Sequence, residues 1–147
     1  MQVKIANSEA QLRKVSSVLL QLRTQYNEDS LLDQIRLQQA EGYQIAYVEK
    51  DGEVLCVAGF VICTKLAWQK HIYVDDLVTG AAVRSTGAGK FIMDWLKNHA
   101  REQGCQQLHL DSGVQRFAAH KFYLREGFEL NSHHFGKIGR ASCRERV

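Results

Sequence analysis

The fold of this chain is decided by the stretch Val78-Thr79-Gly80-Ala81-Ala82-Val83-Arg84-Ser85-Thr86-Gly87-Ala88-Gly89-Lys90. The residues that lead into it, His71–Thr79, predict a strand, and the amphipathic pattern after it predicts a helix that ends near Gly104. The first backbone N–H groups of such a helix have no partner inside the helix, and the helix dipole adds positive charge there. The stretch therefore predicts a site for an anion, typically a phosphate group.

The glycine spacing separates this turn from two common phosphate-binding loops. A Walker A loop needs glycine five residues before Gly89, where Arg84 stands, and the dinucleotide fingerprint needs glycine where Ile92 stands. Gly87 and Gly89 would still let an anion approach the backbone closely, and Arg84 and Lys90 would add positive charge at the rim. The turn thus indicates a phosphate site of another kind, or an ordinary helix start.

The rest of the chain alternates between helical and extended patterns. The expected elements are a strand at Gln2–Ile5, a helix capped by Ser8 with Gln11 as its capping-box partner, a helix from Ser30 to Gly42, strands at Tyr43–Glu49 and Glu53–Thr64 joined by an Asp51-Gly52 turn, a strand at Gln107–Asp111, a helix at Gln115–Glu126 and a strand at Phe128–Phe135. Hairpin-linked strands that feed a strand–helix–strand unit predict an α/β fold with a mixed sheet flanked by helices.

Length and composition narrow the classes of protein. A chain of 147 residues with 45% apolar and 24% charged residues suits one globular domain, and the formal charge of +3 is spread along the chain, so we expect no nucleic-acid partner. No apolar run has the roughly 20 residues of a membrane span, and the first residues do not form a signal peptide. The four cysteines form no C-x-x-C pair, and no Cys/His set has zinc-ligand spacing. We therefore expect a cytoplasmic protein with no metal and no membrane partner.

The last ten residues, 138–147, show no apolar periodicity. They resemble one reading frame of a common sequencing adapter, so we expect them to be a non-native tail and the globular part to span residues 1–137. Such a tail would indicate that the gene came from bulk, metagenomic DNA.

Two segments carry a resemblance to a known family. Arg84–Gly89 matches the R/Q-x-x-G-x-G/A signature of the GCN5-related N-acetyltransferase (GNAT) superfamily, and Ala119–Phe128 resembles its A-x-x-hydrophobic-Y-x-x-x-G-F segment. Both segments stand in the family's order, and the resemblance covers residues 1–137. It implies the single-domain α/β GNAT fold, with a central mixed sheet of about six to seven strands and about four flanking helices.

The resemblance implies that acetyl-CoA is the co-substrate, with its pyrophosphate on the glycine-rich turn and its pantetheine arm along the preceding strand. The cofactor-binding residues implied are Leu77, Val78, Thr79, Arg84, Ser85, Thr86, Gly87, Ala88, Gly89 and Lys90. Arg116 joins them because it stands seven residues before Tyr123, where the family often has asparagine.

The same resemblance implies direct attack of an amine on the thioester. Tyr123 matches the family tyrosine that protonates the departing thiolate; the alternative is a tyrosine packed on its helix face with its hydroxyl at the surface. An alkyl ammonium with a pKa of about 10 must also lose a proton. Candidate bases are Asp75, Asp76 and His71. The alternative for the two aspartates is an N-cap or salt-bridge role, and the alternative for His71 is an ordinary surface histidine; a chain of waters is a further candidate for the base.

Five acidic residues are candidates for the acceptor side: Glu28, Asp29, Asp33, Asp75 and Asp76. Opposite charges attract, so these residues favour a cationic small molecule such as an aminoglycoside-type antibiotic or a polyamine, which would make an antibiotic-resistance role conceivable. A peptide or protein amine is the alternative acceptor. A non-catalytic CoA-binding regulator is the alternative function, and family members are often homodimers.

Overall fold

The computed structural model describes residues 1–84 and 86–139. The chain divides into two compact units, Met1–Leu110 and Asp111–Val147. The strands of the first unit are β1 (Gln2–Ile5), β2 (Gln44–Lys50), β3 (Glu53–Lys65), β4 (Gln69–Thr79) and β5 (Gln107–Leu110), and its helices are α1 (Glu9–Leu22), α2 (Glu28–Gln39), the 3-10 turn η1 (Ala81–Val83) and α3 (Ala88–Glu102). The second unit contains α4 (Phe117–Arg125).

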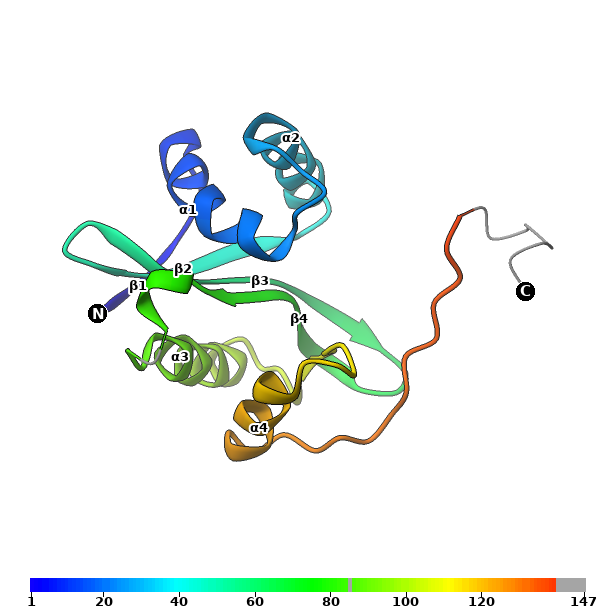
Figure 1. Ribbon diagram of the computed structural model, residues 1–147. Coiled ribbons are helices and arrows are strands. Elements are labelled where there is room, and N and C mark those ends of the chain that lie inside the picture. The colour runs from blue at the N-terminus through cyan, green and yellow to red at the C-terminus, as the bar shows by residue number, and fades with distance from the viewer. Residues whose placement is uncertain (85, 140–147) are drawn as a thin grey trace. The chain divides into compact units, whose positions relative to one another are not determined.

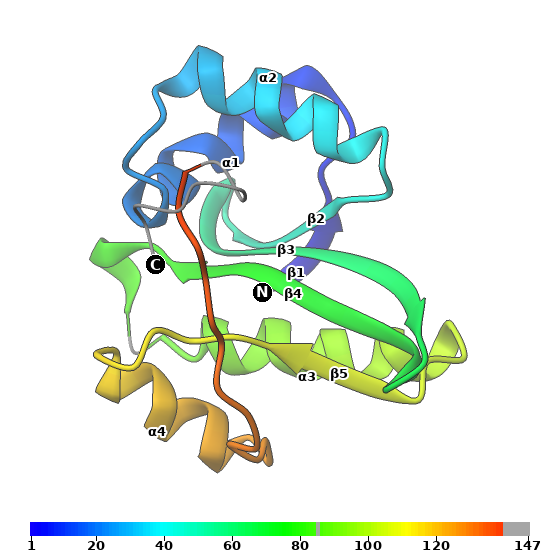
Figure 2. The same ribbon diagram turned by 90° about the vertical axis from the view of Figure 1, so that its right-hand side faces the viewer.

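The first unit has three layers around a mixed sheet whose strands lie in the order β1-β2-β3-β4-β5. Neighbouring strands are antiparallel from β1 to β4, while β4 and β5 are parallel. Helices α1 and α2 cover one face of this sheet and α3 covers the other (Figures 1 and 2). Apolar side chains fill both interfaces: Leu12 and Tyr47 are buried under α1, and the ring of Phe60 lies 6.1 Å from that of Trp95 on α3.

The helix starts follow their capping residues. Ser8 accepts a hydrogen bond from the backbone N–H of Gln11, and the Gln11 side chain accepts one from Ser8 N–H, so the predicted capping box is confirmed. The predicted start of α2 at Ser30 is wrong by two residues. Asn27 caps the helix through a bond from Ser30 N–H, because an asparagine side chain is a strong acceptor at a helix start and Ser30 serves as its third residue.

The predicted hairpin turn is also confirmed. Asp51 and Gly52 both have positive φ, 52° and 77°, as a two-residue turn between β2 and β3 requires. The other predicted strands of the first unit agree with β1 to β5 to within two residues at each end.

The prediction of a strand at Phe128–Phe135 is wrong. These residues have no regular secondary structure, and every described side chain from Glu129 to Gly139 is exposed. A strand persists only when its backbone groups are paired and one face is covered. Within the described residues the sheet therefore has five strands rather than six to seven, and there are four α-helices, the expected number. Of the predicted tail, Ile138 and Gly139 are described, and the rest lies outside the described residues.

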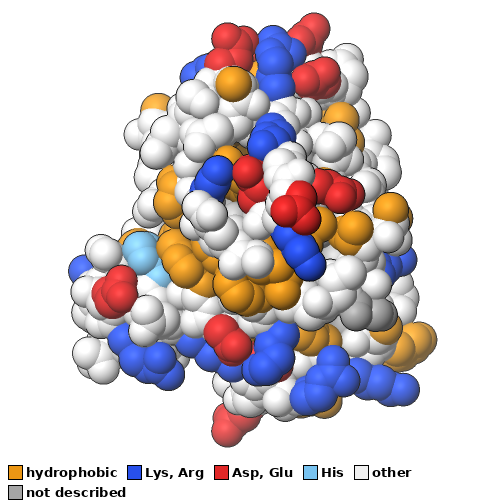
Figure 3. Space-filling view, turned by 90° about the vertical axis from the view of Figure 1, so that its left-hand side faces the viewer, with side chains coloured by type: hydrophobic (Ala, Val, Ile, Leu, Met, Phe, Trp, Pro, Cys, Tyr) orange, Lys and Arg blue, Asp and Glu red, His pale blue; other side chains and the backbone are white. Residues whose placement is uncertain are grey.

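Charge and hydropathy at the surface are mixed. On the face shown in Figure 3, hydrophobic side chains gather in the middle, and Lys and Arg side chains are interspersed with Asp and Glu side chains around them. None of the helices in the two described ranges is long and apolar enough to cross a membrane.

Candidate active site

The sheet opens at the middle of β4. Strand β5 pairs with β4 only from His71 to Val74, where its last residue, Leu110, lies opposite Val74. Strand β4 continues to Thr79 and stays paired with β3 on its other edge. The edge from Asp75 to Thr79 is therefore not paired with β5. Its backbone groups can pair with an extended ligand that carries amides, the predicted role of Leu77, Val78 and Thr79.

A β-bulge lies at the opening. Gly59 of β3 pairs with Asp76 and Phe60 pairs with Val74, so Asp75 is the extra residue in β4. A regular strand would send Asp75 and Asp76 to opposite faces. The bulge shifts this alternation, and both aspartates line one cavity.

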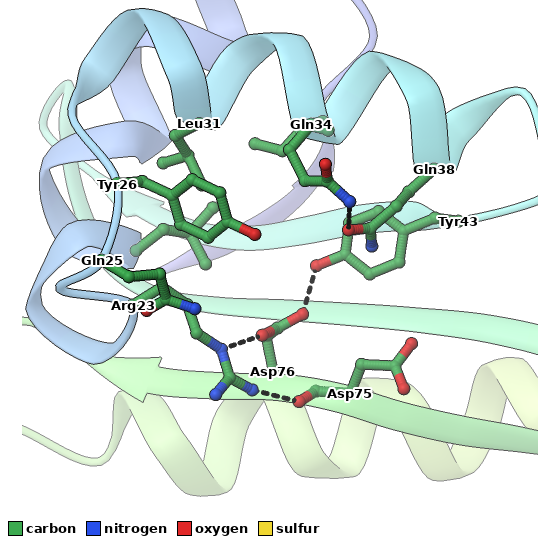
Figure 4. Close-up of a pocket in the computed structure, with 11 residues that line it drawn as sticks. Arg23, Gln25, Tyr26, Leu31, Gln34, Gln38, Tyr43, Asp75 and Asp76 are labelled. Atoms are coloured by element: carbon green, nitrogen blue, oxygen red, sulfur yellow. Dashed lines mark hydrogen bonds and ion pairs between the residues drawn. The ribbon is translucent and has the colours of Figure 1, made fainter. Parts of the chain in front are cut away.

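This cavity has a volume of about 240 Å³ and lies between β4 and the two helices on that face of the sheet (Figure 4). Its lining residues are Leu19, Arg23, Gln25, Tyr26, Leu31, Gln34, Ile35, Gln38, Tyr43, Asp75 and Asp76. Two carboxylates against one guanidinium leave its wall with a formal charge of −1. Apolar side chains of α1 and α2 form one part of the wall, and glutamine and tyrosine side chains supply hydrogen-bonding groups in another.

Asp76 is held on both of its oxygens. Arg23, the residue that caps the end of α1, donates from Nε to Asp76 Oδ1 over 2.7 Å, and the Tyr43 hydroxyl donates to Asp76 Oδ2 over 2.6 Å (Figure 4). Arg23 also donates from an NH2 group to the backbone carbonyl of Asp75 over 2.9 Å. These charge-assisted bonds fix the end of α1 to the bulge of β4.

Tyr43 reaches Asp76 by crossing over Gly59. A Cβ atom on residue 59 would overlap the hydroxyl and the ring of Tyr43, so glycine makes room for this contact. Burial, and then the charge of Asp76, raise the pKa of the Tyr43 phenol far above its ordinary value. The phenol therefore keeps its proton and remains a hydrogen-bond donor.

The start of α3 fits the predicted anion site. Gly87 precedes the helix with φ of 86°, a conformation that suits glycine, and no side chain caps the helix there. The first intrahelical bond runs from Phe91 N–H to the carbonyl of Gly87, which leaves the N–H groups of residues 88–90 without helical acceptors. Thr86 and Arg84 are exposed beside them, Lys90 lies 3.5 Å from Asp94, and Ser85 lies outside the described residues.

His71 lies elsewhere. Its side chain is fully buried, Nδ1 lies 2.8 Å from the carbonyl of Gln69, and Nε2 lies 3.2 Å from Cys63 Sγ. The carbonyl can only accept, so Nδ1 carries the proton and Nε2 faces the thiol. His71 is not among the residues of the cavity, and its geometry argues against the prediction that it is a base for an amine there.

Three of the predicted acceptor-side acids are also absent from the cavity wall. Glu28 and Asp29 lie 3.3 and 3.7 Å from Arg13, and Asp33 is exposed on α2. Their exposure follows from the first turns of α2, where acidic residues favour the helix dipole.

Tyr123 and Arg116 belong to the second unit. Arg116 caps α4 without a side-chain bond, and the Tyr123 ring lies 5.6 Å from Phe122 and 5.9 Å from Phe128. Sequence reasoning missed Arg23 and Tyr43, because each meets Asp76 from a distant part of the chain and neither stands in a motif.

Together, a helix start without a side-chain cap, a strand edge that extends beyond its pairing with β5 and an adjacent polar cavity agree with the family signature. The sequence profile of the acetyltransferase (GNAT) family matches residues 12–128, so the chain belongs to this family and is an acyltransferase that uses acetyl-CoA. Over 122 residues it is 30% identical to the uncharacterized N-acetyltransferase YhdJ of Bacillus subtilis (strain 168). This match covers 82% of this chain and 86% of that protein.

Two further similarities concern part of the sequence and the fold. Over 64 residues the chain is 31% identical to the aminoalkylphosphonate N-acetyltransferase of Salmonella typhimurium, a match that covers 44% of this chain and 42% of that protein. The fold is similar to that of the aminoglycoside N-acetyltransferase AAC(6')-Iy bound to the bisubstrate analogue CoA-S-monomethyl-acetylneamine. That similarity has a TM-score of 0.76 at 17% identity and covers 95% of this chain and 99% of the other.

Proposed function

We propose that the protein transfers the acetyl group of acetyl-CoA to the primary amine of a small molecule bound in the cavity beside β4. The observation that carries this proposal is the position of Asp75 and Asp76. They belong both to the wall of the cavity and to the part of β4 that lies beyond its pairing with β5. An amine in the cavity would thus lie next to a thioester held along that edge.

The reaction needs one bond made and one broken. The amine nitrogen attacks the thioester carbonyl carbon, the new C–N bond forms, and the C–S bond breaks to release the CoA thiolate. The substrate ammonium gives up one proton before the attack and the nitrogen gives up a second on amide formation, while the thiolate takes up one. Tyr123 is the proposed donor to the thiolate.

Asp75 is the better placed of the two aspartates to receive the amine proton, directly or through water. Both oxygens of Asp76 accept hydrogen bonds from Arg23 and Tyr43, so we assign Asp76 the role of positioning the bulge. The Asp75 side chain is exposed at the cavity. Its charge would also attract an ammonium group.

The cavity favours a short amine over a large polycation. A volume of about 240 Å³ is below the roughly 300–1,000 Å³ of sites for drug-sized ligands, so a whole aminoglycoside would have only its amine-bearing end inside. A wall charge of −1 balances one ammonium group, which is less than a polyamine carries. The similarity to an aminoalkylphosphonate N-acetyltransferase supports a small acceptor.

The test is release of free thiol from acetyl-CoA by the purified protein with a panel of short alkylamines, polyamines, aminoglycosides and peptides. We expect turnover with short alkylamines, and Asp75→Asn should raise the KM for the amine while acetyl-CoA binding is kept. Turnover with peptides alone would replace the small-molecule acceptor by a protein amine. Binding of acetyl-CoA without turnover of any amine would favour a CoA-binding regulator.

A further inference from the structure

Arg23 lines the acceptor cavity with a guanidinium group that is only partly used. We propose that Arg23 binds an anionic group of the acceptor, so that the acceptor is a short amine that also carries a carboxylate, sulfonate or phosphonate. This inference rests on the proposed function, because it concerns the substrate of the same cavity.

The donor count of Arg23 leaves room for a ligand. A guanidinium has five N–H donors in one plane. Nε binds Asp76 and one NH2 group binds the carbonyl of Asp75. The remaining donors have no partner among residues 1–84 and 86–139, and the Arg23 side chain is 41% exposed. A planar fork of N–H groups fits an oxyanion through two parallel bonds.

The group is also held in place before any ligand arrives. Its contacts to Asp76 and to Asp75 are 2.7 and 2.9 Å long, and Asp76 is in turn fixed by Tyr43. A long side chain normally loses rotamer freedom when it binds a ligand. Arg23 has already lost much of it, which favours binding of an anion through the donors that remain.

The order of the charged groups in the cavity suits a molecule that carries an anion at one end and an ammonium group at the other. In Figure 4, Arg23 lies on one side of Asp76, and the carboxylate of Asp75 lies on the other side. An acceptor with its anion at Arg23 would have its ammonium end toward Asp75. The small volume of the cavity keeps these two ends close together. A short zwitterion matches this arrangement, whereas a diamine would face the guanidinium with its second positive charge.

The experiment compares acceptors of one chain length. 2-Aminoethylphosphonate, taurine and β-alanine carry the anion, ethanolamine is neutral, and 1,2-diaminoethane is cationic. We expect kcat/KM to be about ten- to a hundredfold higher for at least one anionic acceptor than for ethanolamine, as charge-assisted bonds allow. The preferred anionic acceptor distinguishes phosphonate, sulfonate and carboxylate.

Variants assign the preference to Arg23. In Arg23→Gln the preference should vanish, because KM should rise more for the anionic acceptor than for ethanolamine, whose turnover reports any general effect of losing the contacts to Asp75 and Asp76. Arg23→Lys, which keeps the charge and loses the fork, should be intermediate. Arg13→Gln is the matched control, because Arg13 lies on α1 outside the cavity. Equal turnover of neutral and anionic acceptors by the wild type would overturn the inference, as would an equal loss for all acceptors in Arg23→Gln and Arg23→Lys.

Failure of the proposed function gives a different result. If no acceptor is acetylated, titration calorimetry with 2-aminoethylphosphonate reports binding directly. Binding to the wild type that is lost in Arg23→Gln and weakened in Arg23→Lys would keep the anion site and refute the acetyl transfer. Absence of binding to the wild type would overturn the anion site itself. Circular dichroism and the unfolding midpoint show whether each variant is folded.

Discussion

Replacing Gly59 by alanine should destabilise the protein because it drives Tyr43 away from Asp76. The new Cβ atom would occupy the space of the Tyr43 hydroxyl and ring. Loss of a hydrogen bond to a charged acceptor costs about 1.5–3 kcal/mol. Forcing a buried ring to move costs a further 1–3 kcal/mol, roughly. We therefore expect the free energy of unfolding to fall by about 3–5 kcal/mol.

A double-mutant cycle isolates this cause. Tyr43→Ala alone should cost about 3–5 kcal/mol, because it removes a buried aromatic ring. Once the ring is gone, Gly59→Ala has no side chain to displace, and its additional cost should be within about 1 kcal/mol. The two changes should thus be coupled by about 2–5 kcal/mol. Gly136→Ala is the control, since its Cβ would come no closer than 3.9 Å to His134, and it should change stability by less than about 0.5 kcal/mol.

The assay is urea unfolding followed by the fluorescence of Trp68 and Trp95, with the slope of each transition compared between variants. Additive costs for Gly59→Ala and Tyr43→Ala would refute the reasoning. So would a Gly59→Ala protein of wild-type stability, because the tyrosine would then have another low-energy position. A changed slope would mean that the unfolded or native state had altered, and the cycle would be repeated by calorimetry.

Three further predictions follow from the site. Tyr123→Phe should lower kcat about 10²- to 10⁴-fold in the thiol-release assay while the Kd for acetyl-CoA is kept, and full activity would remove the assignment of this residue as the acid. Gly87→Val should raise the Kd for acetyl-CoA, because a branched residue is strained at φ of 86° and would distort the predicted anion site. Gly104→Val is the control, because it is strained in the same way at φ of 72° but lies at the other end of α3. This control should lose stability and keep the affinity for acetyl-CoA. Burial raises the pKa of the Cys56 thiol from 9.0 to about 11. Between these pH values the folded chain keeps a proton that the unfolded chain loses. The corresponding stability of about 2–3 kcal/mol should be complete below about pH 9 and lost as the pH rises toward 11. Cys56→Ala should reduce this loss in denaturant titrations, and Tyr43 and Cys105, whose pKa values are also raised, should still contribute to it.

The features predictable from the sequence are those whose cause is local. The Ser8 capping box, the Asp51-Gly52 turn and the glycine at the start of α3 each involve residues within a few positions of one another. The contact between Arg23 and Asp76 joins residues 53 positions apart, and no periodic pattern in the sequence indicates it. The prediction of the final strand was wrong for a related reason. Residues 128–135 alternate like a strand, but they form a strand only if a neighbouring strand pairs with them.

The acceptor site was predictable only in part for the same reason. The sequence placed Asp75 and Asp76 in a strand beside the cofactor segment, and a bulge was the one device that would bring both to one side. The bulge itself depends on the register between β3 and β4, which cannot be predicted from a short segment of the sequence. Glu28 and Asp29 do not line this cavity, because a charge near a helix start is satisfied at the surface as easily as in a cleft.

At the junction between α1 and β4, the proposed acceptor site and the proposed cofactor site are built from different kinds of groups. On the proposed cofactor side, the groups available for contact are backbone groups of β4 and α3, which most side-chain substitutions away from Gly87 leave in place. On the acceptor side, the wall is made of side chains from α1, α2 and the segment between them. Substitutions around Arg23 can therefore alter which amine is accepted without rebuilding the donor site, so new acceptors are reachable by single mutational steps.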